Sequence, residues 1–342
     1  MSGDGNRLAA WIWLQEIVKG VRFHDKLGLL DRFAEPDVIF REHPSELSLY
    51  GITPDIHQSF FTSQALDQAR AILDRHLKLG IRHVTRQDPL FRGGDWLVLY
   101  YKGSLSTEPA AAVVGTRQCS AHGYYYAQQV CSSLVSQGFI INSGLAKGID
   151  HQAHRTALDQ GGKTQAFLAH GLDICYPREH AGLLAAILEK GAAITPFSVG
   201  IGPYRHHFAT RNALMCAWSD DVIVVEASEH SGALISAEFA RLMGKRLWTV
   251  ESSSISQRCS GNRALLKLGA KPWRSSDGTP IPDPAPGDDE LLRLLRPGPL
   301  SPDQLVRAIG KPLSVIEDHL VKCSLDHWII FSGDGKWHYN GW

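Results

Sequence analysis

The stretch "INSGLAKGIDHQAHRTAL" (Ile141–Leu158) joins an apolar run to a helical pattern through a loop that is rich in glycine. The apolar run predicts a buried strand, and residues 149–160 predict a helix. Asp150 stands near the helix start, where its carboxylate can cap the helix. Lys147 leaves the turn beside the same helix N-terminus, which favours an anion, although a solvated loop lysine is the alternative. His154 shares the helix face of Asp150, or is simply a satisfied core histidine.

The same alternation of strand, glycine-bearing loop and helix continues along the middle of the chain. Apolar strands without polar alternation, separated by helical patterns, indicate a parallel sheet with helices on both faces, and so an α/β fold. Ligands of such sheets bind beyond the carboxyl ends of the strands. The predicted strands are residues 110–115, 139–142, 164–169, 220–227 and 246–250, and the predicted helices are residues 120–138, 149–160, 178–190 and 233–244.

Composition restricts the class of protein only loosely. The 342 residues include 35 basic and 35 acidic ones, so net charge gives no support for nucleic-acid binding, but a local basic groove remains compatible with it. The six cysteines form no CxxC pair, which predicts reduced thiols and no metal site. We find no targeting segment and no apolar run of the ~18 residues that a membrane span needs. We therefore expect a cytoplasmic protein without a membrane partner.

The chain divides into three predicted domains. Residues 1–85 carry helical stripes, residues 86–274 form the α/β core, and residues 275–287 are a linker rich in proline, glycine and aspartate. Residues 288–342 read as helices followed by two strands joined at Asp334-Gly335, which is a winged-helix pattern. Ser301 begins a capping box in this last domain.

Two further loops at strand ends are candidates for ligand contact. Gly115, Thr116 and Arg117 follow the first core strand, where backbone N–H groups and a guanidinium can hold a phosphate. The loop lacks the GxGxxG pattern, so no dinucleotide cofactor is predicted, and an ordinary strand-to-helix turn is the alternative. In "HGLDICYP" (170–177), Gly171 again follows a strand. Its Asp173 is either a polar ligand contact or a cap, and its Tyr176 either a stacking face or core.

The segment "HHFATRNALM" (206–215) carries Phe208, Arg211 and Asn212 within one stretch of helix. An aromatic ring beside an arginine suits single-stranded nucleic acid, because the ring stacks on a base while the guanidinium binds a phosphate. Arg205 adds to the local basic character. Zinc binding by the two adjacent histidines is the alternative, which their divergent directions on a helix disfavour.

Two more helix starts complete the candidate set. Ser231 and Gly232 open a helix after an apolar strand, and a helix N-terminus of this kind can seat an anion. Gly261 and Asn262 stand at another helix start, where Asn262 can instead be a simple cap.

These motifs together resemble one family. "VVGTR", "SGLAKGIDHQAH", "GLDICYP", "HFATRN", "VVEASEHSGALISA" and "GNRALLKLGA" occur in the order and spacing of the DNA-processing protein A family (DprA/Smf), over about residues 96–273. The resemblance implies an extended Rossmann-like core, an N-terminal helical domain of the SAM or helix-hairpin-helix kind, and a C-terminal winged helix. Thr210 and Ala213 depart from the family, which has arginines there.

The resemblance also implies a function. The family binds single-stranded DNA, protects incoming strands and loads the RecA recombinase in natural transformation, without chemistry on DNA. It implies a homodimer and phosphate contacts from Arg117 and Lys147. The full predicted site is Gly115, Thr116, Arg117, Ser143, Gly144, Lys147, Gly148, Gly171, Asp173, Phe208, Arg211, Asn212, Ser231, Gly232, Gly261 and Asn262.

Two other classes of function stay open at this point. One is a nucleotide-processing enzyme of the phosphoribohydrolase type, for which "HSGALISAE" with Glu238 is a partial match. The other is a binding module that senses nucleotides with the same pocket. Binding of oligonucleotides compared with mononucleotides distinguishes these hypotheses.

Overall fold

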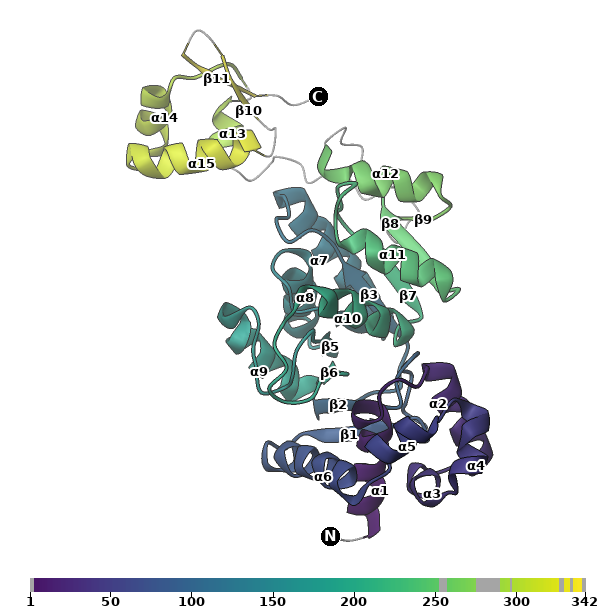
Figure 1. Cartoon of the computed structure of the whole chain (residues 1–342). Helices are drawn as coiled ribbons and strands as arrows, with labels where there is room; N and C mark the ends of the chain where they lie inside the picture. The colour runs from purple at the N-terminus through teal and green to yellow at the C-terminus, as the bar shows by residue number, and fades with distance from the viewer. Residues whose placement is uncertain are drawn as a thin grey trace.

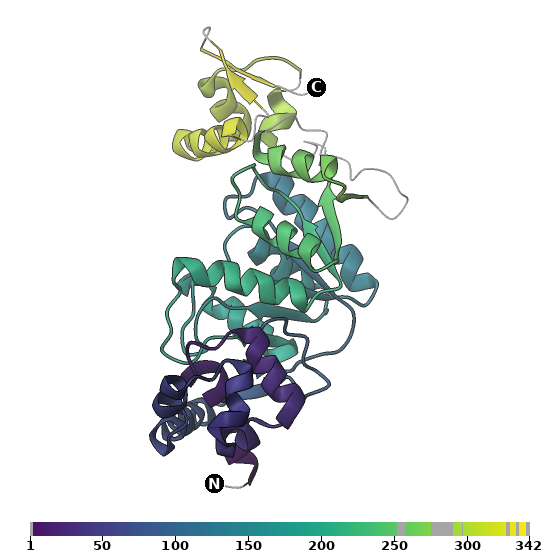
Figure 2. The same cartoon turned by 45° about the vertical axis from the view of Figure 1, so that its right-hand side comes forward.

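A computed structural model describes residues 3–251, 257–274, 290–295, 297–325, 329–332 and 335–339. The predicted linker at 275–287 and Asp334 of the predicted hairpin turn lie outside these residues. Helices of the N-terminal and C-terminal segments lie at opposite ends of a central sheet (Figures 1 and 2).

One nine-stranded sheet forms the centre of the molecule, in the order β1-β2-β6-β5-β4-β3-β7-β8-β9. Within this order the seven strands from β6 through β5, β4, β3, β7 and β8 to β9 pair in parallel, and the apolar runs predicted five of them, β3, β4, β5, β7 and β8. The strands are β1 (Arg82–Thr85), β2 (Val98–Gly103), β3 (Ala110–Val114), β4 (Ile140–Ser143), β5 (Thr164–Phe167), β6 (Ala192–Thr195), β7 (Asp221–Val224), β8 (Arg246–Val250) and β9 (Lys271–Trp273).

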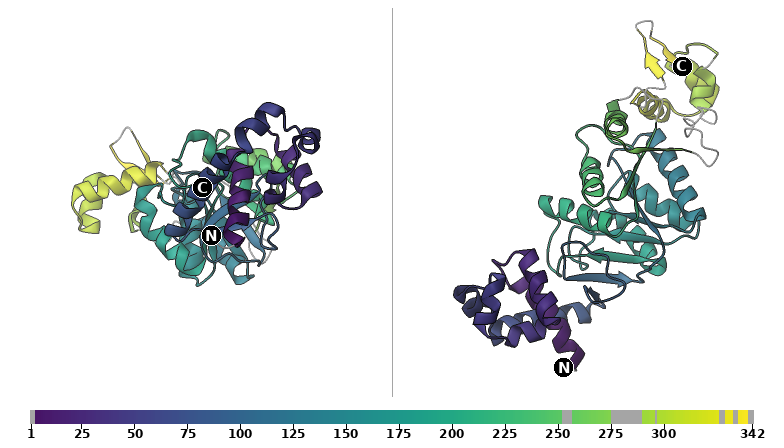
Figure 3. Two further views of the ribbon diagram at one scale, coloured as in Figure 1. Left: turned by 60° about the horizontal axis from the view of Figure 1, so that its bottom comes forward. Right: turned by 90° about the vertical axis from the view of Figure 1, so that its right-hand side faces the viewer.

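Helices cover both faces of this sheet (Figure 3). Ala111 and Val113 of β3 pack with α7 and α8, whereas Ala112 and Val114 pack with the face that carries α10 and α11. The helices of this part are α7 (Ala121–Ser136), α8 (Ile149–Asp159), α9 (Ala181–Lys190), α10 (Arg205–Ala217), α11 (Ala233–Leu242) and α12 (Ser260–Lys267), with the 3-10 helices η3 (Arg178–His180) and η4 (Gln257–Cys259). The predicted Rossmann-like α/β fold is therefore confirmed.

The strand order reverses at β3. After β3 the chain adds β4, β5 and β6 on one side, and then returns to place β7, β8 and β9 on the other. The loops that leave β3 and β7 therefore diverge, which opens a crevice at their carboxyl ends. This topology decides where the candidate site lies.

The sheet is mixed rather than purely parallel, which corrects the prediction. Strand β2 runs antiparallel to both β1 and β6, and β1 begins at Arg82, within the segment predicted to be helical. The sequence pattern did not predict β1, β2, β6 or β9 as strands, and for β1 and β6 the reason is physical. β1 is a short edge strand with polar residues, and β6 is rich in alanine, which has little strand preference.

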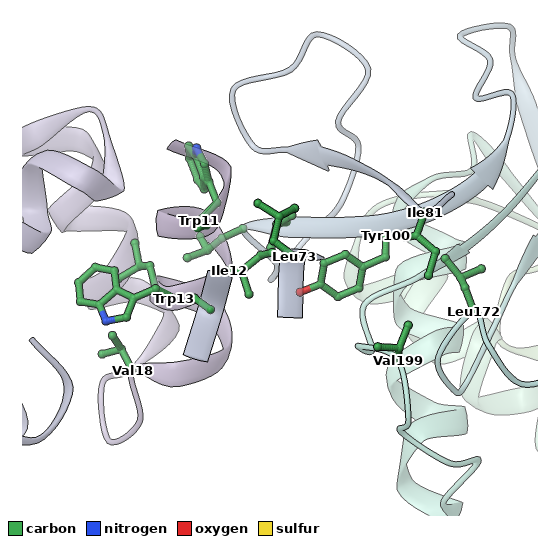
Figure 4. Packing of buried hydrophobic residues seen from close by; sticks show 14 of the residues in the cluster. Trp11, Ile12, Trp13, Val18, Leu73, Ile81, Tyr100, Leu172 and Val199 are labelled. Carbon is green, nitrogen blue, oxygen red and sulfur yellow. The ribbon is translucent and has the colours of Figure 1, made fainter. Parts of the chain in front are cut away.

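The N-terminal segment is helical up to Lys78 and packs on the antiparallel edge of the sheet. Its apolar cluster continues from Trp13 and Leu73 to Tyr100, Leu172 and Val199 of the core (Figure 4). The elements are α1 (Gly3–Ile12), a π-helical turn η1 (Trp13–Ile17), α2 (Phe23–Phe33), α3 (Pro36–Arg41), α4 (Pro44–Leu47), the 3-10 helix η2 (Ser48–Tyr50), α5 (Pro54–Phe60) and α6 (Ser63–Lys78).

Hydrogen bonds accompany this apolar contact. Ser198 Oγ donates to the Glu16 carboxylate at 2.5 Å, and the Val199 N–H donates to His76 Nε2 at 3.3 Å. Tyr100 Oη also donates to Glu16. The N-terminal helices thus hold the loop that leads from β6 to α10.

In its described residues, the C-terminal segment has three helices and an antiparallel pair of strands. They are α13 (Glu290–Leu295), α14 (Pro302–Ile309), α15 (Leu313–Leu325), β10 (Ile329–Phe331) and β11 (Trp337–Tyr339). The capping box predicted at Ser301 is confirmed, because Ser301 and Gln304 exchange both hydrogen bonds. The assignment as a winged helix stays a prediction.

Candidate functional site

A cavity of about 800 Å³ lies where β3 and β7 diverge. It brings together half of the predicted site residues: Gly115, Thr116, Arg117, Phe208, Arg211, Asn212, Ser231 and Gly232. Asp150, Arg205 and His230 also line it. Among the described lining residues, Asp150 is the acidic one, so the cavity walls are mainly basic and polar.

The loop after β3 is held by backbone contacts on two sides. The Thr116 N–H donates to the Glu226 carbonyl at 2.8 Å, and the Thr116 carbonyl accepts from the Ile149 N–H at 3.2 Å. Gly148 permits this approach, since its φ is +73° and a Cβ there would lie 2.3 Å from the Thr116 oxygen. The loop therefore presents the exposed Arg117 from a fixed backbone.

The ring of Phe208 is the centre of an aromatic and cationic group. The guanidinium carbon of Arg117 lies 4.9 Å from the ring centroid and that of Arg211 lies 5.9 Å from it. The ring of Tyr176 packs edge-on at a centroid distance of 6.1 Å. Cations within about 6 Å of a ring are attracted by its quadrupole, so this group is organised before any ligand binds.

Arg211 is buried beneath the cavity and is mostly engaged by the protein. Its Nη1 donates to the Phe167 carbonyl at 3.1 Å and lies 3.9 Å from Asp150 Oδ2. Gly144 leaves the space for this guanidinium, because a Cβ at position 144 would lie 1.4 Å from Nη1. Among the described residues, none accepts a hydrogen bond from Arg211 Nε. We conclude that Arg211 mainly supports the cavity floor.

Asp150 ties down the loop that precedes its own helix. Its Oδ2 accepts from the N–H groups of Gly144 at 3.1 Å and Ala146 at 3.4 Å. The prediction that Asp150 caps α8 is wrong. The N-cap is Gly148, and the Asp150 carboxylate instead accepts from N–H groups that precede the helix. Burial raises the pKa of Asp150, and the nearby Arg211 opposes that rise.

The start of α11 forms the opposite wall. Ser231 Oγ accepts from the Ala233 N–H at 3.3 Å, and a Cβ added at Gly232 would meet no atom within 4 Å. Gly232 therefore faces open space, as expected for a loop that lets a ligand reach the backbone.

The other half of the predicted site residues does not line the cavity. They are Ser143, Gly144, Lys147, Gly148, Gly171, Asp173, Gly261 and Asn262. The Lys147 ammonium pairs with Glu179 at 2.5 Å on the exposed surface. Asp173 accepts from the Gly200 N–H at 2.9 Å. Ser143 Oγ is buried and donates to the Val113 carbonyl.

Asn262 and His154 have structural roles. The Asn262 side chain accepts from the Ala227 N–H and donates to the Val225 carbonyl, both at 2.8 Å, so it joins strand ends and does not cap α12. His154 Nδ1 lies 2.7 Å from Thr164 Oγ1, and burial lowers the pKa of His154 to about 3. His154 is thus a core histidine, with its Nδ1 bonded to Thr164 and, among the described residues, no partner for its Nε2.

Sequence reasoning left out two basic residues of the cavity. The sequence predicts Arg205 only as a local positive charge, and its place in the first turn of α10 puts it on the cavity wall. His230 directly precedes the predicted Ser231–Gly232 anion seat, and that adjacency was the available signal.

The described parts of the chain lack a candidate metal site and a candidate membrane-spanning helix. They contain no group of three or more His, Cys, Asp or Glu side chains that could hold a metal ion. Nor does any helix there have the length and apolarity to span a bilayer.

Known proteins share this fold and these loops. The DNA processing protein DprA of Streptococcus pneumoniae is 37% identical over 177 residues, which are 51% of this chain and 62% of that protein. Its X-ray structure aligns with a TM-score of 0.64 at 27% identity, over 76% of this chain and 93% of that one. The chain spans about half the length of the curated relatives it matches.

A second solved structure, of DNA processing protein A from Helicobacter pylori, describes the single-stranded DNA binding mode of that protein. It aligns with a TM-score of 0.51 at 25% identity, over 56% of this chain and 90% of that one. The family model described as DNA recombination-mediator protein A matches residues 95–279. Because this match extends over more than half of the sequence, the chain belongs to the DNA recombination-mediator protein A family (DprA/Smf).

Proposed function

We propose that this protein binds single-stranded DNA in the cavity beyond β3 and β7. The observation that carries the proposal is the position of Arg117 over the Phe208 ring, at the wall of a cavity that also presents Arg205 and the start of α11. A ring beside a guanidinium can stack on a base and bind the adjoining phosphate. The open backbone at Gly232 can receive a second phosphate.

The single-strand preference follows from the same group. A base stacks on Phe208 only when it has left its own stack, which costs a duplex free energy and costs a single strand much less. We assign the cavity a binding role and no catalytic step.

In the cell, the proposed role is DNA processing in natural transformation, in which the protein protects incoming strands and loads the RecA recombinase. This part of the proposal is supported by membership of the family. We further propose a homodimer through the central domain. Exposed Leu242, the last residue of α11, and exposed Leu268, which directly follows α12, supply apolar surface for such a contact. Light scattering at micromolar concentration tests it, and a monomer mass contradicts it.

Fluorescence anisotropy with labelled oligothymidylate and with a duplex of equal length tests the binding proposal. We expect tighter binding of the single strand, with an affinity that falls as salt rises because bound phosphates release counterions. Arg117→Ala should weaken binding about tenfold and reduce the salt slope by about one. Equal binding of both forms, or no binding at low salt, contradicts the proposal.

Calorimetry with mononucleotides distinguishes the two rival hypotheses. A nucleotide-sensing module or a phosphoribohydrolase-type enzyme would bind a mononucleotide as tightly as an oligonucleotide. We expect the oligonucleotide to bind much more tightly, since it fills more of the cavity.

A further inference from the structure

A ladder of side chains runs along α10 from the rim of the cavity to its floor. Tyr204 is the N-cap of α10, Phe208 follows four residues later and Arg211 three residues after that. Phe208 and Arg211 share one helix face, and Tyr204 directly precedes the first turn of this helix. Exposure falls along the ladder, from 60% at Tyr204 through the half-buried Phe208 to 4% at Arg211. The exposed end of the ladder lies outside the cavity lining.

The ring of Tyr204 is held in place although it is exposed. It packs edge-on against His207 at a centroid distance of 5.3 Å and lies nearly parallel to His206 at 6.2 Å. His207 is itself fixed, because it stacks on Phe197 at 4.0 Å and its Nδ1 lies 3.0 Å from the Gly202 carbonyl. A ring whose orientation is set beforehand loses little conformational entropy when a ligand covers it.

The surroundings of Tyr204 fit a nucleic acid strand. Its sequence neighbours Pro203 and Arg205 both line the cavity, so the rim is continuous with the proposed site. Arg205 supplies a positive charge on one side, and Tyr176, which is 45% exposed, borders Phe208 on the other. An exposed ring beside a cation matches the bases and phosphates of a single strand.

We infer that Tyr204 forms a second base-stacking subsite outside the cavity, so that a bound single strand leaves the cavity across the rim of α10. The inference rests on the proposed function. It adds that the footprint of the strand extends one ring beyond Phe208, and that this outer subsite contributes stacking and no phosphate contact.

The test measures affinity of the full chain for oligothymidylates of about 4 to 16 nucleotides, the range of site sizes for single-strand binders. Tyr204→Ala should weaken the longer oligomers about tenfold, leave the shortest ones unchanged and leave the salt slope unchanged. Tyr204→Phe retains the ring and should bind like the unmodified protein. Arg117→Ala is the matched control within the cavity, and should weaken oligomers of every length.

The outcomes separate the two proposals. If the unmodified protein binds no single strand, the proposed function fails. If it binds and Arg117→Ala weakens it while Tyr204→Ala matches the unmodified protein at every length, the cavity stands and the rim subsite is overturned. If Tyr204→Ala weakens short and long oligomers equally, the ring acts on the cavity from a distance, which also overturns the subsite.

Discussion

Two sets of loops meet at the same end of the sheet and differ in what their glycines and polar residues face. The loop after β3 and the start of α11 face the cavity, with Arg117 exposed and Gly232 open. The loops after β4 and β5 face the protein, with Gly144 against Arg211 and Asp173 bonded to Gly200. Gly232 and Gly144 therefore show one pattern, a glycine beside a polar residue at a strand end, with two uses. Gly115 of the loop after β3 is itself packed, because a Cβ there would lie 2.5 Å from Ile149 Cγ1.

We call the loops after β4 and β5 the closed set, and the loop after β3 with the start of α11 the open set. Loss of the Asp150 charge should destabilise the closed set. Asp150→Ala leaves the buried Arg211 without its carboxylate, and breaking a buried pair in this way costs about 3–5 kcal/mol. Urea denaturation measures the change. Asp150→Asn is the matched control, because its amide oxygen can still accept from Gly144 and Ala146, so its loss should be smaller. Losses below about 1 kcal/mol for both variants would remove the energetic difference between the two sets.

A methyl group separates the two sets directly. Gly144→Ala places a Cβ against the Arg211 guanidinium and should reduce the free energy of unfolding by about 1–3 kcal/mol. Gly232→Ala places a Cβ in open space at a helix start with φ of −60°, and should change stability by less than about 0.5 kcal/mol. Equal effects of the two substitutions would break the comparison.

Acid should act on the closed set through His154. Burial lowers the pKa of His154 to about 3, whereas an exposed histidine has a pKa near 6.5. Between these pH values His154 is protonated in the unfolded chain and neutral in the folded chain. Stability present above pH 6.5 is therefore lost as pH falls from about 6.5 towards 3, by about 1 kcal/mol between pH 7.5 and 5.5. His154→Asn keeps a donor towards Thr164 but cannot titrate, and should show a correspondingly flatter pH profile. Identical profiles would contradict this assignment.

The smallest effect is expected at Lys147, whose exposed pair with Glu179 lies outside the cavity lining. Lys147→Ala should leave the melting temperature unchanged and alter the dissociation constant for single-stranded DNA less than about twofold. Arg117→Ala, the residue of the open set, is the comparison. A loss at Lys147 as large as that at Arg117 would support the phosphate contact that the family resemblance implies, and would extend the site past the closed loops.

The sequence predicted the α/β core well because its buried parallel strands contain apolar runs, as at Ala110–Val114 and at residues 222–224. It missed β2 and β9, and also β1 and β6, whose short polar or alanine-rich sequences lack that signal. In the site, Arg117 and Phe208 could be predicted because each has a side chain suited to a nucleic acid and stands at a predicted strand end or helix start.

The structural roles of Gly144 and Asn262 could not be predicted from the sequence. These roles depend on Arg211 and Ala227, which come from other segments of the chain, and no local pattern contains those partners.

The contact of Gly144 with Arg211 has a consequence for how the sequence can change over generations. Position 144 can gain a side chain only if position 211 first becomes smaller, and a smaller residue at 211 leaves Asp150 buried without its cation. Each single step through these three positions passes through a destabilised intermediate. Positions 144, 150 and 211 should therefore be epistatic: a substitution at one of them is tolerated only together with substitutions at the others.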